Sequence, residues 1–162
     1  TESTELVEQM MTILESCEGD FKQVESLEKY GQIVDRIMGG AQSVAIDFAD
    51  TNHLIHKIGS YAALCKAVSY KASQIKDNPE FYNISVAFLL DATEILEDMI
   101  ENVEDENHEH LKEIFSKTFL DRLQWISNQF GKDVRATVKT PTQKENKMNQ
   151  NEIDELMKKL GL

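Results

Sequence analysis

Residues 80–103 read EFYNISVAFLLDATEILEDMIENV, a run that is apolar on most sides in its first half. Its second half keeps apolar residues at steps of three and four. This pattern predicts a long α-helix that is buried over much of its surface. The preceding residues, Asp77, Asn78 and Pro79, are typical of a helix break, so this helix should begin just after them. A helix buried this deeply requires other helices around it.

The rest of the chain supplies those helices. The first seam of apolar and small residues is Phe21, Val24, Leu27, Gly31, Val34, Met38, Ala41, Ala45 and Phe48, and a second runs from Leu54 to Ile75. A polar segment, ENVEDENHEH, leads to a further predicted helix with apolar residues from Leu111 to Ile126, and residues 4–16 can add a short leading helix. No segment alternates with period two. The sequence therefore predicts an all-α fold, an antiparallel bundle of four to five helices.

The composition of the chain argues against several classes of partner. The 162 residues suffice for one domain with a hydrophobic core plus an appendage. The net charge of -12 argues against nucleic acid and membrane surfaces as partners, because both require clustered basic residues. Cys17 and Cys65 lie in apolar helical contexts and are expected to be buried free thiols. No signal peptide and no apolar run of about 18 residues is present, so we expect a cytoplasmic protein.

The C-terminal part is organised differently. We assign residues 1–130 to the bundle, 131–148 to a flexible linker rich in basic residues, and 149–162 to a short terminal helix. In that helix Ile153, Leu156, Met157 and Leu160 fall on one face, with acidic residues in the first turn. Such a short helix is marginal alone and needs a groove, either on its own bundle or on a partner. We expect a partner.

The tail MNQNEIDELMKKLGL resembles the short peptides with which CheZ-type chemotaxis phosphatases bind CheY-type response regulators. The shared pattern is a polar lead-in, an acid-aliphatic-acid triplet and then paired apolar residues. The resemblance implies that the tail binds a response regulator through Gln150, Glu152, Ile153, Asp154, Leu156, Met157 and Leu160.

A second stretch, LEKYGQIVDRIM at residues 27–38, resembles the catalytic helix of the same family. That helix has an acidic residue four places before a Gln, with Gly directly before the Gln and a basic residue four places after it. The matching residues are Glu28, Gly31, Gln32 and Arg36, and the family has Asp where Glu28 stands. The resemblance implies that Gln32 is catalytic, that Glu28 pairs with a lysine of the regulator, and that a homodimer is possible. On the same helix, Gly31, Asp35, Arg36 and Gly39 are expected to contact the partner.

The same helix can be interpreted from its residues alone. Helical geometry places one set of side chains on an arc opposite the apolar seam: Glu25, Glu28, Gln32, Asp35, Arg36 and Gly39. An amide such as that of Gln32 both donates and accepts, so it can orient a water for attack on phosphorus without titrating. Gly39 would let another protein approach the backbone. The alternative interpretation is that this arc is a solvent-exposed helix face without a function.

These observations lead to one main hypothesis and two alternatives. The main hypothesis is a CheZ-like phosphatase that needs no cofactor of its own, because the magnesium is expected on the partner regulator. One alternative is a non-catalytic adaptor that binds a regulator through its tail. The other is an HPt-like phosphotransfer protein that uses His56, which has small neighbours at Gly59, Ser60 and Ala63.

Overall fold

The structure is a computed structural model, and it describes residues 2–50, 53–104, 116–133 and 153–160. The elements in chain order are α1 (Glu2–Cys17), the 3-10 helix η1 (Phe21–Gln23), α2 (Ser26–Ala45), α3 (Leu54–Ala72), α4 (Pro79–Glu101) and α6 (Lys117–Asp133). Residues 153–159 form one further helix, here called the C-terminal helix. The described residues contain no β-strand, so the predicted all-α class is confirmed.

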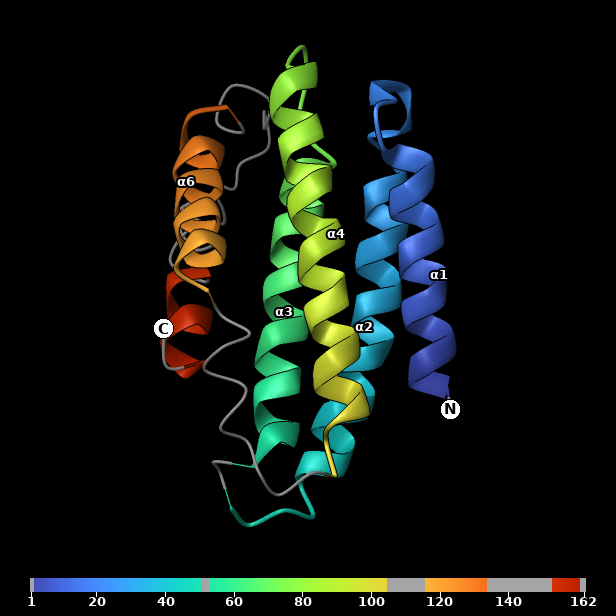
Figure 1. The fold of residues 1–162 in the computed structure, drawn as a ribbon, viewed down its shortest axis with the longest axis vertical. Helices are drawn as coiled ribbons and strands as arrows, with labels where there is room; N and C mark the ends of the chain where they lie inside the picture. Colours follow the sequence, from blue (N-terminus) through green and yellow to red (C-terminus); the bar gives the residue numbers. More distant parts are fainter. Residues whose placement is uncertain (1, 51–52, 105–115, 134–152, 161–162) are drawn as a thin grey trace, which may run out of the picture.

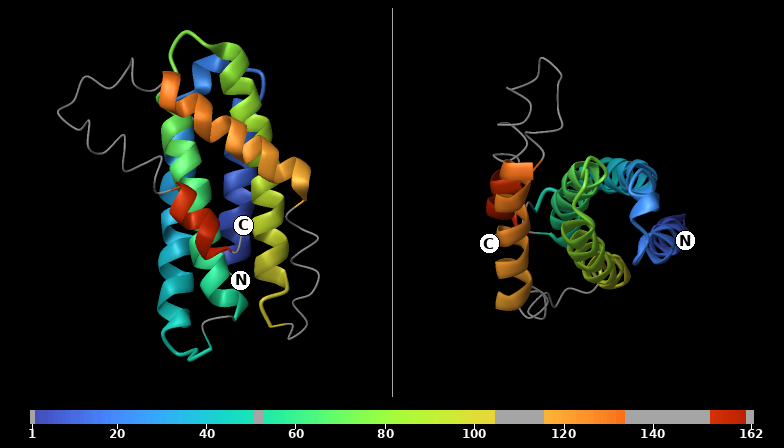
Figure 2. Two further views of the ribbon diagram at one scale, coloured as in Figure 1. Left: turned by 90° about the vertical axis from the view of Figure 1, so that its left-hand side faces the viewer. Right: turned by 90° about the horizontal axis from the view of Figure 1, so that it is seen from above.

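Helices α1 to α4 form an antiparallel four-helix bundle. They run alternately up and down, as Figure 1 shows, and each packs against the next in the chain, with α1 closing the ring against α4. Helix α6 and the C-terminal helix lie in a second layer, on the side of α3 and α4 (Figure 2). The predicted bundle is therefore present, and one of its faces is covered.

The helix break predicted before residue 80 has a clear physical basis. The Asn78 side chain accepts a hydrogen bond of 3.1 Å from the backbone N–H of Phe81, and Pro79 occupies the first turn of α4. A polar cap and an N-terminal proline are both favourable at this position, because the first backbone N–H groups lack helical partners. Asp77 just before the cap has a positive φ of 54°, which turns the chain back toward the bundle.

The single long helix predicted from Phe21 to Phe48 is wrong at both ends. Asp20 caps the separate turn η1, α2 starts only at Ser26, and α2 ends at Ala45. Phe48 lies beyond that end, where it is 40% exposed and its ring centroid is 4.4 Å from that of His53. The apolar spacing continues past the helix end, so periodicity alone could not locate the boundary.

The core draws on all four bundle helices. Its largest fully buried side chains include Met10, Leu14, Tyr30, Tyr61, Tyr82, Phe88 and Leu89. Phe88 of α4 stacks on Phe119 of α6 with ring centroids 5.0 Å apart, which joins the second layer to the bundle. Trp125, expected on the apolar side of the last helix, is instead 44% exposed at the edge of the layer. Leu111, Ile114 and Phe115 lie outside the described residues.

Two tyrosines buried between the bundle helices are hydrogen-bonded. The Tyr30 hydroxyl lies 2.8 Å from Thr93 Oγ1, whose own proton goes to the Leu89 carbonyl, and the Tyr61 hydroxyl donates to the Ala92 carbonyl at 2.7 Å. Both cysteines are buried free thiols, as expected. Burial raises the pKa of the Cys65 thiol to about 12, and it raises the pKa of each of these two tyrosines well above the usual value.

These raised pKa values predict that the fold weakens at alkaline pH. The folded chain keeps the Cys65 proton up to about pH 12, whereas the unfolded chain loses it near pH 9.0. The free energy of unfolding should therefore fall as pH rises from 9 to 12, by roughly 1.4 kcal/mol per pH unit for the Cys65 thiol. The two tyrosines add to this slope only above about pH 10. Urea unfolding at pH 8, 9 and 10 measures this slope. Replacement of Cys65 by Ala should flatten it between pH 9 and 10, and an unchanged slope in that variant would contradict the assignment.

Candidate functional site

Helix α2 presents one face to solvent and the opposite face to the core. Glu28 and Gln32 are both exposed, whereas Leu27, Tyr30 and Val34 between and beside them are buried. The two polar side chains lie four residues apart, so they project side by side from adjacent turns. We call this surface, defined by Glu28 and Gln32, the α2 ridge.

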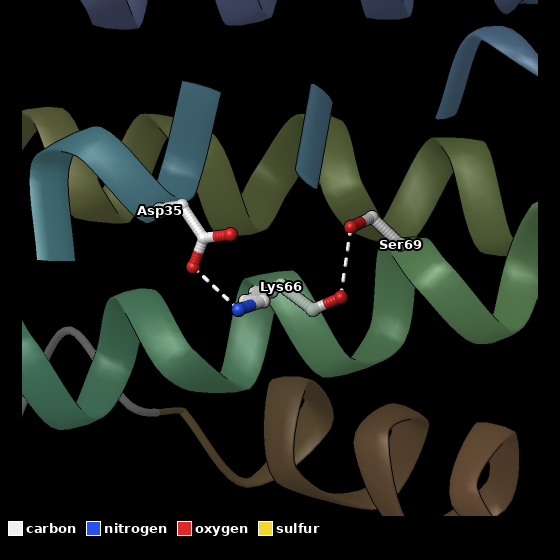
Figure 3. Close-up of polar contacts among 3 residues, drawn as sticks. All are labelled: Asp35, Lys66 and Ser69. Carbon is white, nitrogen blue, oxygen red and sulfur yellow. Dashed lines mark hydrogen bonds and ion pairs between the residues drawn. The ribbon is translucent and has the colours of Figure 1, made fainter. Parts of the chain in front are cut away.

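Two interhelical ion pairs lie one turn farther along α2. Arg36 Nη2 is 3.1 Å from Glu2 Oε1 of α1, and both side chains are largely exposed. Asp35 instead pairs with Lys66 of α3, as Figure 3 shows. Asp35 and Arg36, which helical geometry places on one arc of α2, therefore pair with different neighbouring helices. Each of them fixes α2 against a neighbouring helix, beside the α2 ridge.

Lys66 is the residue at this site that sequence reasoning missed. Its ammonium group contacts Asp35 and lies 5.8 Å from the centroid of the Tyr70 ring, while its carbonyl accepts a 2.9 Å hydrogen bond from Ser69 Oγ (Figure 3). Both members of the ion pair remain partly exposed, so it contributes little to stability, on the order of 1 kcal/mol or less. Its effect is on geometry, because it sets the position of α2 along α3.

Gly31 is buried and faces α3. A Cβ at this position would lie 3.0 Å from Tyr70 Cε2 and 3.1 Å from Ser69 Oγ, so glycine lets the two helices approach closely. Its place in the apolar seam is confirmed, whereas its predicted contact with a partner stays a prediction. Gly39 is exposed, and a Cβ built on it would meet nothing within 4 Å. Gly39 therefore stays available to a partner.

The two ridge side chains have no competing partners. Within the described part of the chain, neither Glu28 nor Gln32 makes a side-chain hydrogen bond or an ion pair. The amide of Gln32 therefore keeps both its donor and its acceptor free for a water or a bound group. The Glu28 carboxylate is equally free to meet a cation brought by another molecule.

His56 is less available than a phosphate-accepting histidine needs to be. Its ring is half-buried, and Nε2 donates a 3.1 Å hydrogen bond to the Phe48 carbonyl. Gly59, expected as an open neighbour, is buried and lies against Gln42 of α2, whose Cγ would be 3.7 Å from a Cβ at that glycine. Phosphorylation at Nε2 would first require the loss of the bond to Phe48.

The C-terminal helix differs most from expectation. Its apolar residues were predicted to await a partner, but Ile153, Leu156 and Leu160 are at most 7% exposed and belong to the main hydrophobic cluster. Met157 packs against that cluster too, and Asp154 is exposed. Figures 1 and 2 place this helix beside α3, below α6. An apolar stripe fits an internal groove as well as an external one, so the sequence could not decide between them.

The remaining predictions for the tail and linker concern residues that lie largely outside the described ranges. Gln150 and Glu152 are among these, as is the linker beyond Asp133, where α6 ends three residues later than the expected domain boundary. Within the described ranges no group of three His, Cys, Asp or Glu side chains could hold a metal ion. No described helix has the length and apolarity needed to cross a membrane.

Hollows are present in the surface of the described residues. One of about 400 Å³ lies between α4 and α6 and is lined by Asp91, Glu94, Ile95, Asp98, Ser116, Thr118, Phe119 and Arg122. Another of about 370 Å³ follows α3 and is lined by Met38, Ala63, Lys66, Ala67, Tyr70, Lys71 and Gln74. Neither is lined by Glu28 or Gln32. Glu28 and Gln32 thus lie on the exposed surface of α2, outside both hollows.

Comparison with known proteins does not add to this picture. No family model matches the chain, and searches of curated proteins and of solved structures also return no match.

Proposed function

We propose that this protein is a CheZ-like phosphatase, which binds a phosphorylated CheY-type response regulator and promotes hydrolysis of its aspartyl phosphate. The observation that carries the proposal is the α2 ridge, where Glu28 and Gln32 are exposed, adjacent and unpaired within the described residues. Enzymes that act on small molecules usually enclose them in a concave pocket. A projecting pair of polar side chains suits a substrate that is itself a protein with a pocket.

The chemistry assigns a simple task to Gln32. The side-chain carbonyl accepts a hydrogen bond from the attacking water, and the side-chain N–H₂ donates a hydrogen bond to the phosphoryl group, so the water is held in line with phosphorus. The water oxygen forms the new bond to phosphorus as the bond to the aspartate oxygen breaks. Inorganic phosphate and the free aspartate are the products. The magnesium that neutralises the phosphoryl oxygens belongs to the regulator.

Glu28 is proposed to hold the ridge in register. One turn before Gln32, its carboxylate can pair with an active-site lysine of the regulator, as the resemblance to the family implies. The ion pairs of Asp35 with Lys66 and of Arg36 with Glu2 support α2 from both sides, so a partner meets a pre-positioned helix. Gly39 leaves open space for the partner farther along α2.

The test is phosphate release from a CheY-type regulator of the same genome, phosphorylated with a small-molecule phosphodonor. Addition of this protein should shorten the lifetime of the phosphoryl group by roughly 100-fold, the scale expected when an attacking group is positioned. Binding without any change in lifetime would replace the phosphatase by an adaptor. Transfer of phosphate to this chain, lost in the His56→Ala variant, would establish phosphotransfer instead.

A further inference from the structure

We propose that the C-terminal helix is a self-docked latch that competes with the response regulator for one set of apolar side chains. The inference rests on the proposed function, because it assigns the regulation of the same partner. It starts from a conflict between an expectation from the sequence and an observation in the structure. The tail has the pattern of a regulator-binding peptide, yet Ile153, Leu156 and Leu160 are buried in the protein's own hydrophobic cluster.

The conflict matters because the C-terminal helix has only one apolar face. On the opposite face Asp154, Glu155, Lys158 and Lys159 are all exposed. Docking into any second groove must therefore bury the stripe that is already buried here. The helix can occupy its seat on the bundle or a groove on the regulator, and it cannot occupy both at once.

The seat is formed on the outer side of α3. The C-terminal helix lies beside α3 in Figures 1 and 2, on the side that α6 also covers. Ala63 and Ala67 of α3 and Met38 of α2 are partly buried, line the hollow of about 370 Å³ described above, and pack against the main hydrophobic cluster, to which the buried tail residues also belong. Two alanines one turn apart leave room for another helix to lie close to α3.

Competition of this kind sets the strength of regulator binding. The apparent affinity for the regulator is reduced by the fraction of molecules in which the helix is undocked. A seat that holds nine helices in ten would weaken binding about 10-fold, without any change at the regulator's groove. Conversely, a bound regulator would keep the helix away from α3 and expose that face.

The decisive variant changes the seat and leaves the tail intact. Ala63→Glu places a carboxylate on the partly buried side of α3, and Ala87→Glu, at an exposed position of α4, is the matched control. Hydrogen exchange on the full chain should show faster exchange at residues 153–160 for Ala63→Glu only. Binding to a CheY-type regulator activated with beryllofluoride should tighten about 10-fold for that variant and stay unchanged for the control.

A second pair of variants guards against misfolding. Leu156→Glu should also speed exchange in the tail, but it should weaken regulator binding, because the same side chain serves both grooves. Lys159→Gln changes the net charge equally at an exposed position and should alter neither measurement. If Ala63→Glu also loses protection in α1 to α4, Ala67→Glu replaces it.

The outcomes separate the latch from the proposed function. A freed tail in Ala63→Glu with unchanged regulator affinity would overturn the latch and leave the phosphatase intact. Unprotected tail amides in the wild-type chain would do the same, because no docking would then exist. Absence of regulator binding in the wild type and in every variant would overturn the proposed function, and the competition with it.

Discussion

Replacement of Gln32 by Ala should reduce the rate of phosphate release to that of the regulator alone, a loss of roughly 100-fold, while regulator binding stays within about twofold of wild type. The reason lies in the exposure of this side chain. Gln32 is exposed and makes no side-chain hydrogen bond among the described residues, so its loss should not disturb α2. Stopped-flow measurement of phosphate release, with binding measured separately by calorimetry, separates the two effects.

The matched control for this variant lies on the same helix. Gln42 is also exposed, but it lies ten residues farther along α2, on a different side of the helix. Gln42→Ala should therefore keep full activity. Equal loss of activity in both variants would indicate a general weakening of α2, and full activity in Gln32→Ala would remove this residue from the mechanism.

Truncation of Phe88 to Ala should lower the free energy of unfolding by about 3–5 kcal/mol, the usual cost of removing a buried aromatic side chain. Phe88 is only 1% exposed, and it connects two layers of the fold. Its ring stacks on Phe119, and the Arg122 guanidinium carbon lies 5.6 Å from its centroid. Both partners belong to α6, so the loss should also loosen that helix. Urea unfolding gives the energy, and hydrogen exchange in α6 shows the loosening.

Phe48→Ala is the natural comparison for this truncation. Phe48 was expected in the core but is 40% exposed beyond the end of α2, where its ring meets His53. Its removal should cost about 1 kcal/mol or less, because little buried apolar surface is lost. Equal costs for the two phenylalanines would mean that the end of α2 is packed more tightly than the structure describes.

The helical class and most of the core could be predicted from the sequence because both depend on periodicity. The buried face of α4 follows from the run at residues 80–103, and its start follows from Asn78 and Pro79. Helix ends were harder to predict. Apolar residues such as Phe48 continue the spacing past the end of α2, and a capping residue such as Asp20 divides an apparently continuous pattern.

The candidate site, too, could be predicted from the sequence only in part. The exposure of Glu28 and Gln32 follows from their place opposite the seam, which is a property of one helix. Lys66 could not be found, because its pairing with Asp35 depends on how α3 is aligned with α2. The position at which the C-terminal helix docks is also a tertiary property, because its apolar stripe fits a groove on its own bundle as well as a groove on a partner.

The order in which the helices pack also bears on how the chain folds. Each helix of the bundle contacts its neighbour in the sequence, and only the closure of α1 against α4 joins distant segments. Folds dominated by such local contacts form on a scale of microseconds to milliseconds. During synthesis, α1 to α4 leave the ribosome before residues 153–160 exist. The bundle should therefore already be assembled when the tail emerges, and each new molecule would pass through a brief period with α3 uncovered.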